Sequence, residues 1–235
     1  MAFRKPTSSG QSLVKSTLAE QTYEILKGRI LDQDLLPGAR LNIDAISKEL
    51  SVSSSPIREA LVRLEAERLV VLELYSGYSV APQPTPKYLH KLLDFRILVE
   101  GACAQIGAEE RDPVTLGTLT NLVATMAKTH RLGTKYVEYR KFVEADAKFH
   151  MAVVDSGHNE VISEIYAGMH VLLLQSRLYL NRRGGPTSSQ TVLDEHRAIL
   201  KAYEDGDGAR AAKVIRDHLE KGRERLLAAM GDDTV

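Results

Sequence analysis

Three prolines within seven residues, in the segment APQPTPK at 81–87, constrain the fold more than any other feature of this chain. Proline fixes its own φ angle and biases the residue before it toward extended geometry. Such a segment is typical of a stiff linker, which we place at 82–87. The prediction is therefore one domain at 13–81 and a second at 88–230, with residues 1–12 as a disordered tail.

The overall charge points to no partner. The chain of 235 residues has 31 Lys+Arg and 31 Asp+Glu, so a DNA-binding function would have to depend on a local surface. The single cysteine, Cys103, excludes an intrachain disulfide and suits a reducing compartment. No apolar run approaches the ~20 residues that span a bilayer, and the basic, polar start is not a secretory signal. We expect a cytoplasmic protein without membrane segments.

The first predicted domain has the order helix, short helix, tight turn, helix and hairpin. The first helix, at 17–32, would place five residues on one side: Leu18, Thr22, Ile25, Leu26 and Ile30. The second helix would run at about 43–50, and the third would begin at Pro56 with Ser55 as its N-cap. The segment VVLELYSGYSVAP alternates around a Ser-Gly pair and predicts a β-hairpin. This order is typical of a winged helix-turn-helix.

In a winged helix-turn-helix, the helix after the tight turn lies in the major groove with its N-terminal residues on base edges. Arg58 is near the start of that helix and is the strongest candidate for a DNA contact. The hydroxyls of Ser53, Ser54 and Ser55 are candidates for contacts to phosphates or bases, and Gly77 would let the wing backbone approach DNA closely. A small α+β domain that binds protein remains the alternative.

The second predicted domain shows helical periodicity almost throughout. The pattern is broken at five places: 111–113, 132–134, 156–159, 182–189 and 204–208. These breaks leave about six helices, which favours an all-α antiparallel helix bundle. The fold class predicted for the chain is thus mainly α.

Polar residues lie on the apolar faces of three predicted bundle helices. In the stretch DAKFH, Asp146 and His150 are one helical turn apart and share a face with Phe142 and Val153. His196 and His218 occupy similar positions on two further helices: each has apolar neighbours at helical spacing. A carboxylate and three imidazoles are a plausible ligand set for a divalent transition metal. A single inward histidine is more often a core residue bonded to a neighbour, so spacing alone leaves both interpretations open.

Two arginines are candidates for holding a carboxylate. Arg96 has apolar neighbours at helical spacing, with Glu100 one turn further on. It could form a structural pair with Glu100, or its guanidinium could bind the carboxylate of an effector. Arg177, in LLLQSRLYL, is a weaker candidate of the same kind.

The first domain resembles the DNA-binding domain of the GntR family of bacterial transcription regulators. The resemblance rests on PGARL at 37–41, SPIREAL at 55–61 and the wing glycine Gly77. Two features depart from the family pattern: Ser54 replaces the usual arginine, and the wing YSGYS lacks a basic residue. Residues 1–80 also carry ten Lys+Arg and ten Asp+Glu, so weaker DNA binding is expected than is usual for the family.

The second domain resembles the FCD ligand-binding domain of the FadR-like subfamily. The matching motifs are FRILVEGACA, DAKFH, GHNEVI, DEHRAIL and GDGARAAKVIRDHL. The resemblance implies that Asp146, His150, His196 and His218 are metal ligands and favours a role for Arg96 at the effector pocket. Zinc is the metal expected by default, with nickel or manganese as alternatives.

Together these features predict a ligand-responsive transcription regulator, expected to be a repressor. It would bind a pseudo-palindromic operator in double-stranded DNA as a homodimer and sense a small organic acid at the metal site. Two alternatives stay open: a metal-dependent hydrolytic enzyme, and the same regulator with a metal-free effector pocket.

Overall fold

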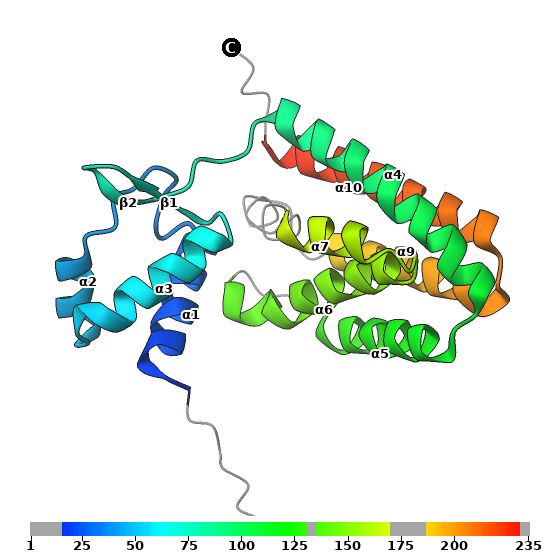
Figure 1. Ribbon diagram of the computed structural model, residues 1–235, viewed down its shortest axis with the longest axis horizontal. Helices are drawn as coiled ribbons and strands as arrows, with labels where there is room; N and C mark the ends of the chain where they lie inside the picture. The colour runs from blue at the N-terminus through cyan, green and yellow to red at the C-terminus, as the bar shows by residue number, and fades with distance from the viewer. Residues whose placement is uncertain (1–15, 131–134, 170–186, 231–235) are drawn as a thin grey trace, which may run out of the picture.

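The computed structural model describes residues 16–130, 135–169 and 187–230. The tail predicted at 1–12 lies outside these ranges, as does Arg177. Within them the chain forms a small N-terminal unit and a larger helical unit, which lie side by side (Figure 1). No helix in the described ranges is long and apolar enough to cross a membrane.

The N-terminal unit is a winged helix-turn-helix. It consists of α1 (Leu18–Leu31), α2 (Ile43–Leu50), α3 (Ser54–Ala66), β1 (Val70–Glu73) and β2 (Gly77–Val80). The two strands pair antiparallel, from Val70 with Val80 to Glu73 with Gly77, and Arg40 bridges to Ser79 on the outer side of β2. Ile57, Leu61, Leu64 and Leu69 are buried in its core, as their spacing predicts.

Two details of the first domain were predicted wrongly. The helix α3 begins at Ser54 with Ser53 at the N-cap, so Ser55 is inside the helix and Pro56 is its third residue. A proline is tolerated there because N–H groups in the first turn have no partner within the helix. On α1, Leu18 is 57% and Ile25 is 42% exposed, whereas Tyr23 is buried. Thr22, Leu26 and Ile30 are buried as predicted. The Tyr23 hydroxyl donates to Glu67, which follows α3, at 2.5 Å.

The C-terminal unit contains six helices in the described ranges: α4 (Pro86–Glu110), α5 (Pro113–Thr129), α6 (Tyr136–Asp155), α7 (Glu160–Gly168), α9 (Thr187–Asp205) and α10 (Gly208–Met230). The long helices α4 and α10 run antiparallel along one side of the bundle, and α5, α6 and α9 form the rest of its core (Figure 1). The last two residues of the predicted linker, Pro86 and Lys87, belong to α4, because the Thr85 side chain caps the helix by accepting from the Tyr88 N–H.

The helix α4 crosses the end of α6 at very short range. A Cβ atom added to Gly107 would lie 2.0 Å from Oγ of Ser156, and one added to Gly157 would lie 2.6 Å from Sγ of Cys103. The Ser156 hydroxyl donates to the carbonyl of Val153 at 2.7 Å. Because any side chain at either glycine would force the backbones apart, these two residues fix where α4 and α6 cross.

Candidate metal and DNA-binding sites

Three helices bring the predicted ligand residues together. Asp146 and His150 lie on α6, His196 on α9 and His218 on α10; the three histidines are buried, and their ligand atoms lie within 4.8 Å of one another. The Nε2 atoms of His150 and His218 are 3.3 Å apart. The Oδ1 atom of Asp146 is 3.1 Å from Nε2 of His196 and 3.9 Å from Nε2 of His150.

Each histidine is oriented by a partner at its other ring nitrogen. Nδ1 of His150 donates to Oε2 of Glu100 at 2.6 Å, and Nδ1 of His218 donates to Oε2 of Glu195 at 2.7 Å. Nδ1 of His196 donates to the carbonyl of Val192 at 2.7 Å. Carboxylates and carbonyls only accept hydrogen bonds, so the proton of each neutral ring is held on Nδ1. All three Nε2 lone pairs therefore face the shared centre.

The two carboxylates are themselves held ionised by arginines. Nε of Arg96 donates to Oε1 of Glu100 at 2.6 Å. Burial would raise the pKa of Glu100, but Arg96 and His150 outweigh it and hold that pKa at about 2. Arg225 binds Glu195 through both terminal nitrogens, at 2.9 and 2.8 Å. Burial opposes ionisation of Glu195 too, and its pKa is likewise about 2 because His218 and Arg225 stabilise the carboxylate.

The inner atoms of the cluster fit a bound cation. Burial keeps His218 neutral by lowering its pKa to about 3, and burial also lowers the pKa of His150. Nε2 of His196 is buried and has no hydrogen-bond donor among the described residues, although Oδ1 of Asp146 is 3.1 Å away. Lone pairs that face one another repel unless a proton or a cation lies between them. A nitrogen and oxygen donor set of this kind suits a divalent transition metal.

A cavity of about 20 Å³ adjoins the cluster, with Arg96, Asp146, His150, His218 and Arg225 in its wall. This volume is enough for one water or ion. Arg96 is fully buried and is one of the residues that line this cavity beside the histidines. Arg177, the other predicted effector contact, lies outside the described residues.

Four residues of this site were not among those predicted. Glu195 and Arg225 were not identified from the sequence. Helical spacing offers Tyr166 only as a possible lining of the cavity, and Glu100 only as a partner of Arg96. Tyr166 donates its hydroxyl to Oε1 of Glu100 at 2.7 Å, from α7. Glu195 directly precedes His196 in the chain, yet it holds His218 of α10. Each of these contacts joins different helices, so helical spacing within one segment gives no signal for them.

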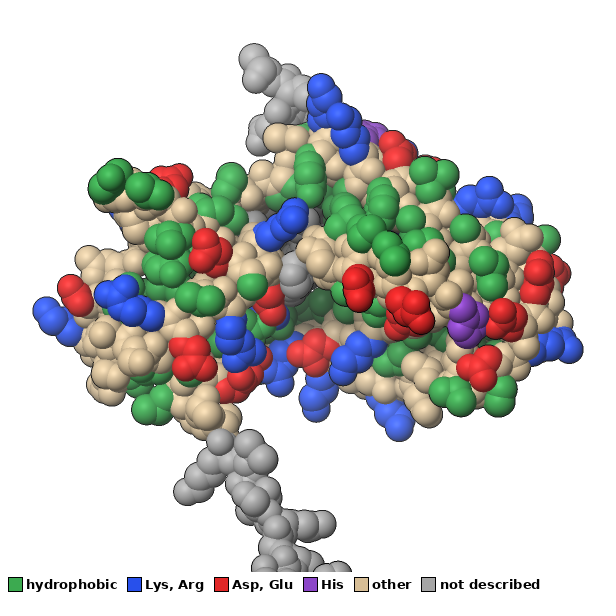
Figure 2. Space-filling model, viewed as in Figure 1, with side chains coloured by type: hydrophobic (Ala, Val, Ile, Leu, Met, Phe, Trp, Pro, Cys, Tyr) green, Lys and Arg blue, Asp and Glu red, His purple; other side chains and the backbone are tan. Residues whose placement is uncertain are grey.

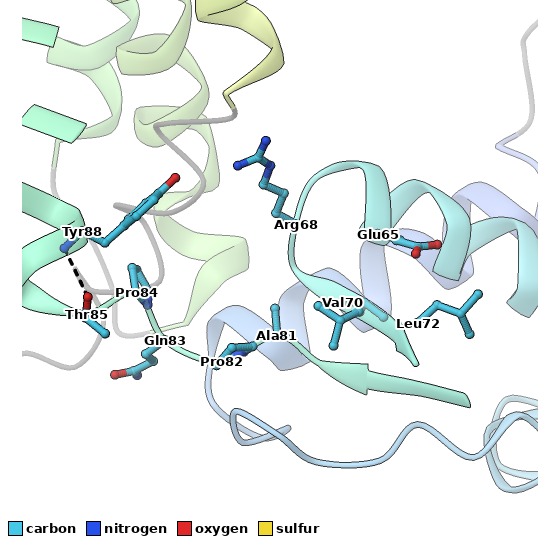
Figure 3. A pocket seen from close by; sticks show the side chains of 11 residues that line it. Glu65, Arg68, Val70, Leu72, Ala81, Pro82, Gln83, Pro84, Thr85 and Tyr88 are labelled. Atoms are coloured by element: carbon cyan, nitrogen blue, oxygen red, sulfur yellow. Dashed lines mark hydrogen bonds between the residues drawn. The ribbon is translucent and has the colours of Figure 1, made fainter. Parts of the chain in front are cut away.

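A larger hollow, of about 600 Å³, lies between the two domains and away from the histidines. Its walls come from the wing, the linking segment and the start of α4, and Arg68 and Tyr88 extend toward it from opposite sides (Figure 3). The hollow shows that the linking segment is not packed tightly between the domains.

The predicted DNA-contacting residues lie on the surface of the winged unit. Ser53, Ser54, Ser55 and Arg58 are exposed at the start of α3. Gly77 is exposed at the start of β2, and its φ of 79° is a backbone conformation that favours glycine. These positions are open to solvent and reachable by a large ligand.

Comparison with known proteins gives the family. The description "Bacterial regulatory proteins, gntR family" matches residues 18–80, and "FCD domain" matches residues 91–221. The uncharacterized HTH-type transcriptional regulator YdhC of Bacillus subtilis (strain 168) is 28% identical over 206 residues, which cover 88% of this chain and 89% of YdhC. The galactonate operon transcriptional repressor of Escherichia coli (strain K12) is 27% identical over 209 residues, covering 79% and 87%.

A solved structure supports the fold. E. coli McbR/YncC superposes with a TM-score of 0.68 at 17% identity, covering 92% of this chain and 100% of the other. The family domains and the named relatives are those of regulators, which excludes the enzymatic alternative. The chain therefore belongs to the GntR family of bacterial regulatory proteins, and it is a transcription regulator in which a GntR DNA-binding domain precedes an FCD domain.

Proposed function

We propose that this regulator is a homodimeric repressor that binds operator DNA and senses a small carboxylate metabolite at a metal site in its helical domain. The observation that carries the proposal is the convergence of three histidine Nε2 atoms and the Asp146 carboxylate, with every Nδ1 held by an acceptor. An arrangement needed only to bury histidines would not require all three lone pairs to point at one centre.

The ligand set of the proposed site is Asp146, His150, His196 and His218. A metal held there, zinc by default, would supply a Lewis acid for the oxygen atoms of an organic acid. Glu100 and Glu195 orient two of the imidazoles and raise their basicity. Arg96 would face the carboxylate of the effector at the cavity wall. Its pairing with Glu100 would then join the effector to the His150 side of the site.

Operator binding is supported by the distribution of charge on the winged unit. Several of its basic side chains are engaged within the protein: Lys27 binds Glu67 at 3.0 Å, and Arg29 and Arg63 pair with Glu49 and Glu20. Arg40, Lys48 and Arg58 are exposed and form no ion pair with described residues. We propose these three as the main cationic DNA contacts, with Arg58 on base edges.

A homodimer is supported by an apolar surface on the helical domain. Hydrophobic side chains gather where α4 and α7 face solvent (Figure 2), and four of them are exposed: Leu98, Ile106, Val161 and Ile165. Exposed apolar groups in a contiguous patch commonly mark a protein interface. A two-fold dimer through this surface would present two winged domains to a pseudo-palindromic operator. We propose repression rather than activation because the similar galactonate operon regulator of Escherichia coli is a repressor.

Metal analysis of untagged protein tests the proposal. We expect about one equivalent of a divalent transition metal per chain, as a site with deprotonated ligands should retain it. The double variant His196→Ala and His218→Ala should lose that metal and any response of DNA binding to organic acids. Untagged protein that takes up neither zinc nor nickel would refute the metal site and favour a metal-free effector pocket. A thermal-shift screen of organic acids on zinc-loaded protein would then identify the effector class.

A further inference from the structure

The two domains touch directly where α1 meets the start of α6. We propose that this contact is the connection through which occupancy of the metal site changes DNA binding, with Asp32 as its positioning residue. The inference rests on the proposed function, because it takes the histidine cluster as a metal site. Asp32 is not among the residues of either candidate site.

Asp32 caps a helix of the other domain. It directly follows α1, and its Oδ1 accepts a hydrogen bond from the backbone N–H of Tyr136 at 2.7 Å. Tyr136 is the first residue of α6, so its N–H has no partner within the helix. A carboxylate at this position also interacts favourably with the helix dipole. The DNA-binding domain therefore completes the N-terminus of the helix that carries Asp146 and His150.

Packing and charge strengthen the same contact. Tyr136 and Tyr139 are buried against the core of the winged unit and meet edge to face, with ring centroids 5.5 Å apart. Arg140 donates to Glu24 of α1 at 2.7 Å, and Lys135 lies 3.3 Å from Asp34. The first turns of α6 thus belong to the helical domain by sequence but to the winged domain by packing.

On the DNA side, α1 is tied to the recognition helix α3. The guanidinium of Arg63 on α3 lies 3.9 Å from the ring centroid of Tyr23 on α1. Arg63 also pairs with Glu20 on α1. A displacement of α1 would therefore carry α3 with it, together with Ser53, Ser54, Ser55 and Arg58.

On the metal side, α6 continues without interruption from Tyr136 to Asp155. Asp146 lies ten residues beyond Tyr136, about 15 Å along the helix axis. The covalent linkage offers a looser path, since the linking segment at 81–85 borders the large hollow between the domains. The packed contact of α6 with α1 is thus the firmer route between the two sites.

The test uses the full-length protein and a DNA duplex selected by the wild-type protein from a random-sequence library. The dissociation constant of the protein–DNA complex is measured for zinc-loaded and for chelator-stripped protein, and the zinc stoichiometry of each preparation is measured alongside. In the wild type we expect the two constants to differ on the order of tenfold, a usual size for coupling between sites. In the double variant Asp32→Ala and Glu24→Ala the two constants should agree within about twofold, with zinc stoichiometry unchanged.

Two control variants separate this role from a general loss of stability. Glu49→Ala removes the carboxylate partner of Arg29 inside the winged unit, a surface ion pair like that of Glu24 with Arg140, and should keep the wild-type ratio. Asp32→Asn keeps a side-chain oxygen that can accept from the Tyr136 N–H. This variant should retain much of the wild-type ratio of the two dissociation constants. The inference is overturned if the double variant retains the full wild-type ratio. It is also overturned if the wild type binds zinc but its two dissociation constants are equal. Failure of the wild type to bind zinc overturns the proposed function instead.

Discussion

Glu100 and Glu195 each fix the orientation and the tautomer of one histidine in the cluster. Each accepts from Nδ1 of one ring and is itself bound by an arginine, which gives the series Arg96–Glu100–His150 and Arg225–Glu195–His218. The two series approach the cavity from different helices. Metal affinity should therefore depend on residues that do not themselves contact the metal.

Replacing Glu195 with glutamine tests that dependence. The substitution keeps the size of the side chain but removes the charge that Arg225 and His218 share, so zinc affinity should fall about 10- to 100-fold. Competition with a chelator of known affinity measures this change. The matched control is Glu110→Gln, which alters the exposed Glu110–His158 pair. Equal zinc affinities for the two variants would contradict the proposed role of Glu195.

The buried histidines also predict how stability depends on pH in metal-stripped protein. Burial lowers the pKa of His218 from 6.5 to about 3. The unfolded chain therefore takes up a proton below pH 6.5 that the folded chain accepts only near pH 3, and the free energy of unfolding must fall as pH decreases through this window. The decrease due to His218 approaches at most about 1.4 kcal/mol per pH unit.

Urea unfolding of the stripped protein between about pH 7.5 and about pH 5 measures this slope. The variant His218→Asn should show a shallower slope over the same range. An identical slope in both proteins would mean that His218 is not held neutral by burial.

Among the elements, α3 is where DNA recognition should be concentrated. Arg58→Ala should weaken DNA binding and reduce the slope of log affinity against log salt by about one, if Arg58 also neutralises a phosphate. Arg68→Ala is the control, since Arg68 is an exposed cation of the same domain but extends into the hollow between the domains. Fluorescence anisotropy over a salt series measures both variants. Equal losses in affinity for the two variants would mean that α3 does not lie in the groove.

The elements also show what helical spacing can and cannot predict. The spacing of Phe142, Asp146, His150 and Val153 was sufficient to predict that α6 turns polar groups inward. On α1 the spacing predicted Leu18 and Ile25 wrongly and did not predict the buried Tyr23, whose hydroxyl donates to Glu67, 44 residues away. The contacts of Glu100 with His150 and of Glu195 with His218 were not predicted, because each joins two different helices. Spacing predicts which face of one helix is buried, but it does not predict which residues of a neighbouring helix contact that face.

At the scale of the whole molecule, the exposed face of α4 and α7 predicts the oligomeric state. Leu98→Glu places a charge on the most exposed apolar residue of that face, and a charge buried in an interface without a partner is strongly destabilising. The variant should be a monomer by light scattering after size-exclusion chromatography. Val114→Glu, at an equally exposed apolar position on α5, should remain a dimer. Dissociation of both variants, or of neither, would argue against this interface.

The crossing of α4 and α6 at Gly107 and Gly157 has a geometric consequence. Because the backbones are in contact there, any relative movement of the two helices that keeps this contact is a rotation about that point. Glu100 lies seven residues from Gly107, about 10 Å along α4, whereas Pro86 lies about 31 Å away. On α6, the distances of His150 and Tyr136 from the crossing have nearly the same ratio. A displacement of 1 Å at the Glu100–His150 hydrogen bond would thus become about 3 Å at the helix ends that adjoin the DNA-binding domain. Under the proposed function, the position of the two glycines would therefore determine how far a small movement at the histidine cluster displaces the DNA-binding domain.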